Sequence, residues 1–367
     1  MAECLEESEQ EFTNKSIALQ LIDLAEKEEF NYLELSDINF QNGVIFKRLE
    51  RLDKIKKITI KNTNINNLSK FPPNIEEILI RKGEICIANF ILIPNTVTNI
   101  SIINNKISEI IYINRLLNLV YLDLSQNNLS EIPPLPENLL TFIATHNKIL
   151  EISNLNSKLV ELNLSNNLIT ECENIPYGIE SINLSRNFIK IIDLSSFNKL
   201  KVFKGYSNHL NLIIGPISKY IEVFDVFNNY LVAVPDIGED VKEIDLSDNN
   251  LKVLPKFGNK VLERIDITKN PLLKISDDEI IMLEDINKQN KSLTAIFDQF
   301  DVDNVLFDSS SSEFSSESEL GFNLYDNYRE PVHNLNILDF LSQIRTNQKS
   351  PTLIRGKEIT KRRSYEM

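Results

Sequence analysis

The sequence predicts an α/β solenoid, a curved stack of coils in which each coil contributes one short strand to a parallel sheet. The first observation is a repeat of 20 to 22 residues, because a fixed period of this kind is the signature of a solenoid. The second is the alternation of apolar and polar residues ahead of each repeated asparagine, which is the period of a strand with one buried face. The nine asparagines are Asn105, Asn127, Asn147, Asn167, Asn187, Asn208, Asn229, Asn249 and Asn270.

Three weaker units precede the asparagine series. They carry Ile38, Thr63 and Gly83 at the position of the asparagine and keep the apolar frame around it. Twelve units therefore occupy about residues 30–275. Strands stacked about 4.8 Å apart would form a sheet about 55 Å long, curved with the strands on the inside.

The repeats resemble those of a known family. The segments "LVYLDLSQNNL" and "VKEIDLSDNNL" match the leucine-rich-repeat signature L-x-x-L-x-L-x-x-N-x-L, and the resemblance covers about 260 of the 367 residues. It implies a right-handed horseshoe with a parallel concave sheet. The segment "EIPPLPENLLTFIATHNKI" is similar to the short repeats of bacterial secreted leucine-rich-repeat effectors. Abundant asparagine and an excess of isoleucine over valine indicate an A+T-rich coding genome, such as that of a protist or a giant virus.

The repeated asparagine has a structural interpretation. Where the chain turns out of a strand, backbone groups lose their ladder partners, and each buried unpaired group costs about 1–3 kcal/mol. An amide side chain both donates and accepts, so we expect each asparagine to bond the turn of its own coil and of the next coil. The arm that follows is rich in proline, which breaks helices, so the convex side should be extended or polyproline-like.

The ends of the solenoid need caps, because the terminal coils would otherwise expose their apolar edges. Residues 1–29 are predicted to be an acidic segment with a helical cap, and residues 276–300 a second helical cap with Ser276 at its N-cap. Residues 301–367 should be a disordered acidic serine-rich linker and a basic tail. The apolar faces of the two helices are predicted to contain Ile17, Leu21, Leu24 and Ala25, and Ile280, Ile281 and Leu283.

Charge is unevenly distributed along the chain. The formal net charge is -14, but residues 1–29 contribute -7, residues 298–330 contribute -8 and residues 345–367 contribute +5. The solenoid is therefore nearly neutral, which argues against a broad nucleic-acid-binding face. A local basic patch on neighbouring strands could suit an acidic partner or the acidic linker of the chain itself. Its members are Lys57, Lys61, Arg81 and Lys82.

The amino terminus lacks a secretory pattern, and no apolar run reaches the length of a membrane span. We therefore expect a cytoplasmic protein, with a nuclear location as the alternative, and no membrane association.

The concave face can be read from the residues that alternate with the core leucines. Most of these residues are small and polar, but two neighbouring units carry aromatic, aliphatic and charged side chains, a combination typical of interaction hot spots. An alternative is that Tyr206 or Phe227 only covers a gap left by Gly205. Next to them, the acidic column Asp225, Asp245 and Asp266 is interpreted as a solvated face. The predicted protein-binding residues are Val202, Lys204, Tyr206, Val223, Asp225 and Phe227.

Nothing in the sequence predicts catalysis, a cofactor or a metal site. His146 and His209 have no neighbouring nucleophile, the three cysteines form no disulfide or zinc framework, and glycines are too sparse for a phosphate-binding loop. We expect a monomeric, non-enzymatic scaffold or adaptor that binds a partner protein on its concave face. The alternative is a regulatory or targeting subunit of an enzyme such as a phosphatase or a ubiquitin ligase.

Overall fold

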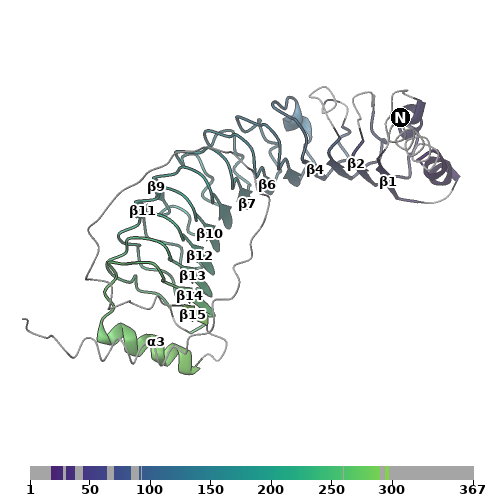
Figure 1. The fold of residues 1–367 in the computed structure, drawn as a ribbon. Helices are drawn as coiled ribbons and strands as arrows, with labels where there is room; N and C mark the ends of the chain where they lie inside the picture. The colour runs from purple at the N-terminus through teal and green to yellow at the C-terminus, as the bar shows by residue number, and fades with distance from the viewer. Residues whose placement is uncertain are drawn as a thin grey trace, which may run out of the picture.

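The chain forms a curved solenoid in the computed structural model, with the strands on the inner side of the curve (Figure 1). The structure describes residues 18–27, 30–37, 44–63, 70–83, 91, 93–258, 260–289 and 294–296. Thirteen parallel strands form the main sheet in the order β1-β2-β3-β4-β5-β6-β7-β8-β10-β12-β13-β14-β15. This confirms the predicted horseshoe fold with a parallel concave sheet.

The strands fall into two length classes. The first four have five residues each: β1 (Tyr32–Ser36), β2 (Lys57–Lys61), β3 (Glu77–Arg81) and β4 (Asn99–Ile103). The later strands of this sheet have three residues each. They are β5 (Tyr121–Asp123), β6 (Thr141–Ile143), β7 (Glu161–Asn163), β8 (Ser181–Asn183), β10 (Val202–Lys204), β12 (Val223–Asp225), β13 (Glu243–Asp245), β14 (Arg264–Asp266) and β15 (Thr294–Ile296).

The convex arms are mainly extended, but they contain four short elements that the sequence reading did not predict. Strands β9 (Ile191–Asp193) and β11 (Leu212–Ile214) pair in a separate two-stranded sheet. Helix α2 (Val44–Leu49) lies in the return arm of the first coil, and the 3-10 helix η2 (Ile113–Arg115) lies in a later arm. The first unit, at 25 residues, has room for a short helix that a 20-residue unit lacks.

The core is one continuous cluster of buried apolar side chains that runs through the stack. Within a coil, a large buried side chain at one core position is accompanied by a small residue at the next core position, so that the core volume is conserved. Phe142 is buried next to Ala144, and Phe203 is buried next to Gly205. A Cβ at Gly205 would lie 2.9 Å from Cζ of Phe203, so the Phe203 ring fills the space of the missing leucine. The alternative in which Tyr206 or Phe227 covers this gap is therefore wrong.

The turn out of each strand is made by a residue in the left-handed region. In all twelve predicted units the residue before the asparagine position has a φ between 47° and 57°. Half of these residues are Asn or Asp, which tolerate this conformation best among non-glycine residues. The twelve residues are Asp37, Asn62, Lys82, Asn104, Gln126, His146, Asn166, Arg186, Ser207, Asn228, Asp248 and Lys269.

The nine repeated asparagines are buried, with 4–8% of each residue exposed. Asn187 is typical. Its Oδ1 accepts a hydrogen bond from the backbone N–H of Ile169 at 3.0 Å, and its Nδ2 donates to the carbonyls of Leu164 at 3.0 Å and Leu184 at 2.9 Å. Each amide thus bonds its own coil and the preceding coil, whereas the sequence reading expected the following coil.

The amino-terminal end of the described structure begins with a helix over residues 18–27. Its buried side chains are Ala18, Ile22 and Ala25, which follow the i, i+4, i+7 spacing of one helix face. Leu21 and Leu24 are exposed, so the prediction that they face the core is wrong. The small alanines on the buried face allow the helix to approach the first coil closely.

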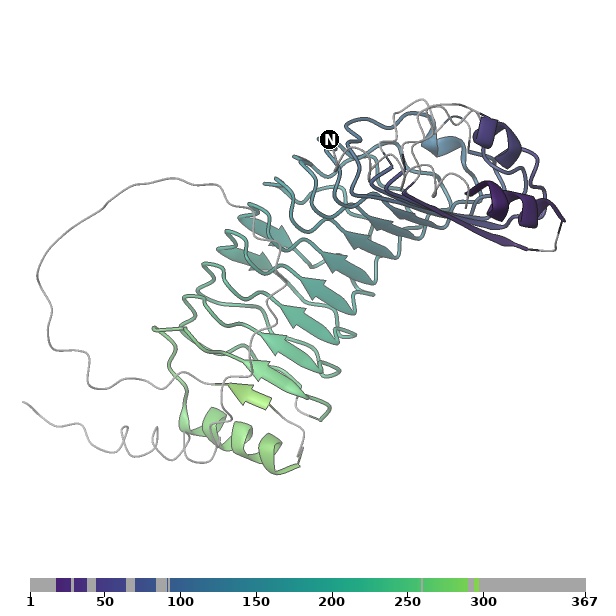
Figure 2. The same ribbon diagram turned by 45° about the vertical axis from the view of Figure 1, so that its right-hand side comes forward.

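At the other end, helix α3 (Asp277–Gln289) lies beyond the last coil of the stack. Figure 2 also shows that the strands of the main sheet all point the same way. Ser276 and Glu279 form a capping box: Ser276 Oγ accepts from the N–H of Glu279, and a Glu279 carboxylate oxygen accepts from the N–H of Ser276 at 2.7 Å. Ile280 and Leu283 are buried, but Ile281 is exposed. The chain then returns to the sheet as β15, a strand that the sequence reading did not predict.

Candidate functional site

The structure brings the six predicted protein-binding residues together. Strands β10 and β12 are direct neighbours, with Val202 opposite Val223 and Lys204 opposite Asp225. Two residues beyond these strands, the rings of Tyr206 and Phe227 stack with a centroid distance of 4.7 Å and an interplanar angle of 13°. All six side chains are partly exposed. We call these six residues the concave cluster.

Asp225 differs from the acidic residues next to it in its hydrogen bonds. Asp245 accepts from the N–H of Ser247 at 3.1 Å and from its hydroxyl at 2.6 Å. Asp266 accepts from the N–H of Thr268 at 3.1 Å and from its hydroxyl at 2.8 Å. In the coil of Asp225 the hydroxyl residue is replaced by Phe227, whose N–H donates at 3.4 Å. Asp225 therefore lacks the short hydroxyl bond that its column neighbours have.

Two residues of the acidic column are buried and Asp225 is partly exposed, which corrects the interpretation of the column as a solvated face. Asp245 is 8% exposed and Asp266 is 1% exposed. Burial, together with the negative charge of Asp245, raises the pKa of Asp225 to about 7, although Lys204 and Arg264 act in the opposite direction. Burial also raises the pKa of Asp245, against the hydrogen bonds from Ser247. The carboxylates thus lie in surroundings that disfavour their charged forms.

The predicted basic patch is partly neutralised by glutamates on neighbouring strands. The ammonium of Lys61 lies 2.6 Å from a carboxylate oxygen of Glu34, and that of Lys57 lies 2.8 Å from one of Glu77. These pairs use two of the four basic side chains of the patch. The surface therefore alternates in sign across β1, β2 and β3 and does not present a single block of positive charge.

The sequence reading missed a row of aromatic side chains on the flank. Phe188, His209 and Tyr230 each follow a repeated asparagine by one residue, and all three are exposed. The ring centroids of Phe188 and His209 lie 5.6 Å apart, and those of His209 and Tyr230 lie 5.9 Å apart. The signal was present in the sequence, because the same position holds Leu168 in the preceding coil and these three rings in the next three coils.

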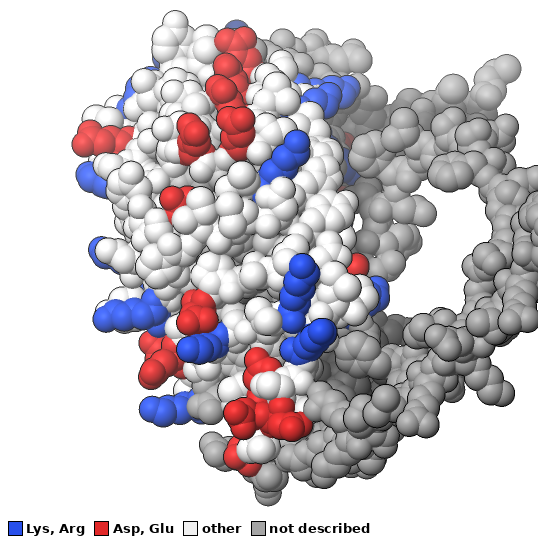
Figure 3. All heavy atoms as spheres, turned by 90° about the vertical axis from the view of Figure 1, so that its left-hand side faces the viewer, with Lys and Arg blue, Asp and Glu red and all other residues white. Residues whose placement is uncertain are grey.

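The convex side also carries exposed apolar residues. Figure 3 shows this side, where uncharged side chains occupy most of the face and charged ones are scattered among them, with acidic side chains gathered at the lower end. The convex strands β9 and β11 contribute Ile191, Leu212 and Ile214, each at least 41% exposed.

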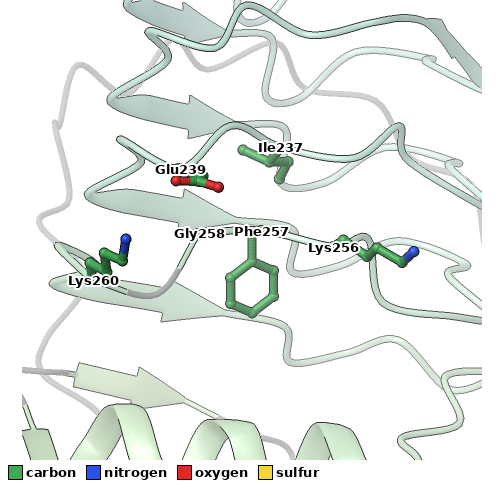
Figure 4. Close-up of a pocket in the computed structure, with 6 residues that line it drawn as sticks. All are labelled: Ile237, Glu239, Lys256, Phe257, Gly258 and Lys260. Atoms are coloured by element: carbon green, nitrogen blue, oxygen red, sulfur yellow. The ribbon is translucent and has the colours of Figure 1, made fainter.

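A pocket of about 330 Å³ lies between the segments that lead into β13 and β14, near the carboxyl-terminal end. Its described lining includes Glu239 and Lys260, whose charged ends lie on the same side of the pocket, and Phe257, whose ring points toward the next coil (Figure 4). A Cβ at Gly258 would lie 2.3 Å from Cα of Glu239, so the two segments approach so closely that only glycine fits there. The remaining lining residues are Ile237, Lys256 and Gly258.

Among the histidines and cysteines that the sequence singled out, His146 and Cys172 occupy structural positions. His146 is a left-handed turn residue, and its ring Nδ1 lies 3.4 Å from the hydroxyl oxygen of Thr145. Burial raises the pKa of the Cys172 thiol to about 12, so this thiol stays protonated at neutral pH. Cys4, Cys86 and His333 lie outside the described residues.

No helix among the described residues is long and apolar enough to cross a membrane.

Stacked coils with one strand each, a leucine and isoleucine interior and a ladder of buried asparagines are the features of a leucine-rich-repeat fold. The model of the Leucine Rich Repeat family matches residues 118–139, which include β5 and Asn127. No curated protein sequence matches the chain.

Among solved structures, the functional domain of InlJ from Listeria monocytogenes is 18% identical, with a TM-score of 0.54 over 72% of this chain and 59% of that chain. The ectodomain of the receptor kinase GASSHO1/SCHENGEN3 from Arabidopsis thaliana is 15% identical, with a TM-score of 0.50 over 67% of this chain and 34% of that one. YopM, a leucine-rich effector protein from Yersinia pestis, is 16% identical, with a TM-score of 0.48 over 71% and 80% of the two chains. The chain spans less than two thirds of the first two structures, and likeness at these identities shows the fold alone.

Proposed function

We propose that this leucine-rich-repeat protein is a scaffold or adaptor that binds a partner protein on its concave face, centred on the concave cluster. The single observation that carries this proposal is the stacked pair Tyr206 and Phe227 beside the half-buried Asp225. Partly exposed aromatic rings next to a charged group are typical of binding hot spots. In this proposal the chain is a monomer in the cytoplasm or the nucleus and carries no catalytic step itself.

The surroundings of the cluster support the same proposal. On β8, the strand next to β10, the concave positions hold Ser181 and Asn183, whose short side chains leave the inner surface of the curve open, and β7 beyond it holds Glu161 and Asn163. A partner can therefore reach the aromatic pair without displacing bulky neighbours. The GASSHO1/SCHENGEN3 ectodomain was solved in complex with CASPARIAN STRIP INTEGRITY FACTOR 2. Analogy at the level of the fold supports binding of a partner but does not identify it.

The test compares a concave variant with a matched flank variant. The double substitution Tyr206→Ala and Phe227→Ala removes the stacked pair, and the control Phe188→Ala and Tyr230→Ala removes two rings from the flank. Proteins captured from cell extracts by the full-length chain are compared by quantitative mass spectrometry, and the affinity of the main captured protein is then measured with purified components. We expect the concave variant to bind at least ~30-fold more weakly, as for loss of a hot spot of about 2 kcal/mol.

The flank variant should bind like the unmodified chain. If the concave variant keeps its affinity while the flank variant loses it, the binding site lies on the flank and the proposal is wrong.

A further inference from the structure

Asp225 is a half-buried acceptor whose bonding capacity is largely unused. A carboxylate can accept about four hydrogen bonds, yet the bond described for Asp225 is the long one from the N–H of Phe227 at 3.4 Å. The hydroxyl that serves Asp245 and Asp266 is absent from this coil, because Phe227 stands in its place. Replacing a hydroxyl by an aromatic ring therefore leaves an acceptor at the surface and places an apolar face beside it.

The charges around Asp225 leave an excess of negative charge. Three carboxylates follow one another on β12, β13 and β14, namely Asp225, Asp245 and Asp266, and Glu243 adds a fourth at the start of β13. The cations that face this column are Lys204 and Arg264. Arg264 is engaged by Asp245, at 3.5 Å between Nη2 and Oδ2. Among the described residues, two positive groups therefore face four negative ones.

We propose that the concave cluster binds an arginine side chain of the partner protein, with the guanidinium hydrogen-bonded to Asp225 and packed against the Tyr206 and Phe227 rings. This inference rests on the proposed function, since it names the chemical group that the concave face recognises. It also assigns Asp225 and the two rings a single shared ligand.

The chemistry of the site favours arginine over other groups. A guanidinium is planar, is more weakly hydrated than an ammonium and stacks on aromatic faces while it donates two parallel hydrogen bonds to a carboxylate. Cation–π contacts of this kind contribute about 0.5–2 kcal/mol. An anionic ligand would meet the four carboxylates, and a purely apolar ligand would leave Asp225 buried without a partner, which is costly. Val202 and Val223 would contact the aliphatic stem of the arginine.

The binding should depend on pH in a stated direction. The guanidinium pairs with the ionised form of Asp225, and the pKa of this carboxyl in the free protein is about 7. Affinity should therefore rise as the pH increases from 6 to 8, with a limiting slope of tenfold per pH unit below the pKa. The groups that set this behaviour are Asp225 itself, Asp245, Glu243, Lys204 and Arg264.

The experiment uses the full-length chain and three short probes, N-acetyl-Gly-X-Gly-amide, in which X is arginine, citrulline or lysine. Citrulline has nearly the shape of arginine but no charge. Binding is followed through the methyl resonances of Val202 and Val223 in selectively labelled protein. We expect the arginine probe to shift both resonances with a dissociation constant of about 1–10 mM, the lysine probe to bind more weakly, and the citrulline probe to leave the resonances unchanged.

Two variants complete the test. Asp225→Asn, which keeps the shape of the side chain, should weaken binding of the arginine probe at least ~10-fold at pH 8. Asp193→Asn, on the convex strand β9, should leave it unchanged. Equal binding of arginine and citrulline, equal binding to the Asp225→Asn variant, or no shift with the arginine probe would each overturn the inference.

Failure of the arginine inference is separable from failure of the proposed function. If the arginine probe does not bind but the Tyr206→Ala and Phe227→Ala variant still loses the partner protein, the concave face is the binding surface and its ligand group is a different one. If that variant keeps the partner as well, both proposals are wrong.

Discussion

The first three units and the nine asparagine units make the same turn with different side chains. In both regions the residue before the asparagine position is left-handed, and its N–H donates to the coil that follows: Asn62 to Arg81 O at 2.9 Å, and Gln126 to Thr145 O at 2.8 Å. In the asparagine units the amide adds bonds to two coils. In the second unit the hydroxyl of Thr63 donates to the carbonyl of Lys61 at 2.7 Å, and in the third Gly83 has no side chain to contribute.

This difference separates the group that shapes the turn from the group that stabilises it. Because the turn is the same with and without an amide, the left-handed residue determines its shape. The amide supplies partners for backbone groups that the turn leaves unpaired. The strands of the first three units have five residues, and most strands of the asparagine units have three. As a result, β1 and β2 pair over five positions, whereas β12 and β13 pair over three. Longer strand pairing takes the place of amide bonds.

The largest predicted effect is loss of an amide in the middle of the ladder. Asn187→Leu removes four side-chain bonds, to the backbone of Ile169, Leu164, Leu184 and Ser185, and leaves those groups buried. We expect the free energy of unfolding to fall by about 3 kcal/mol or more. Thr63→Val, at the same position in an early unit, removes the hydroxyl bond to the carbonyl of Lys61 and should cost about 1 kcal/mol.

Urea unfolding of both variants, followed by circular dichroism, measures the difference. Equal losses at Asn187 and Thr63 would contradict the account that the two regions satisfy their turns differently.

A second prediction concerns the pH dependence of stability at Asp225, the one acidic column residue without a hydroxyl partner. In the unfolded chain its pKa is about 3.9, and in the folded chain it is about 7. Between these values the folded state holds a proton that the unfolded state has released. Stability should therefore decrease as the pH rises from about 4 to about 7, by about 2 kcal/mol in total from this group. Asp225→Asn should remove this decrease and be the more stable protein at pH 8.

Urea midpoints of the two proteins across this pH range provide the measurement. Parallel curves for the unmodified protein and the Asn variant would show that Asp225 is not destabilised by burial.

A third prediction tests the packing that distinguishes the β10 coil from its neighbours. Gly205→Leu restores the leucine of the repeat but meets the Phe203 ring, so we expect a loss of about 1–3 kcal/mol. Adding Phe203→Leu should recover most of that loss, because the pair then has the leucine frame of β7 and its neighbours. A double-mutant cycle by urea unfolding reports the coupling. Additive effects of the two substitutions would mean that the ring does not fill the glycine space.

The smallest predicted effect tests what the two regions share. Asn166→Val and Asn62→Val place a β-branched residue in the left-handed turn, and each should cost about 1–2 kcal/mol. Asn166→Gly and Asn62→Gly should be nearly neutral, since glycine adopts this conformation without strain. Thermal unfolding of the four variants gives the comparison. A turn that tolerates valine in one region only would show that the regions do not share the same turn.

The period, the strands and the repeated asparagines could be predicted from the sequence because each depends on residues close together in the chain. The left-handed residue could not, since Lys82, Arg186 and Lys269 do not signal such a turn. Apolar spacing alone also assigned the buried faces of the cap helices partly wrongly: Leu21, Leu24 and Ile281 are exposed because the caps pack through smaller or differently spaced residues.

For the candidate site, the alternation of buried and exposed residues along each strand correctly placed its six residues on one face of the sheet. The ring stack, the largely buried acidic column and the filling of the Gly205 space depend on contacts between coils, which spacing within one repeat does not specify.

The most direct test of the account is a site-specific photo-crosslink to the partner protein. A photoreactive phenylalanine analogue placed at Val223 lies in the concave cluster, and the same analogue at Leu212 lies on the convex strand β11. After irradiation in cell extracts, the account predicts a defined covalent adduct from position 223 that disappears in the Tyr206→Ala and Phe227→Ala variant, and none from position 212. An adduct from position 212 alone would contradict the claim that the concave face binds the partner.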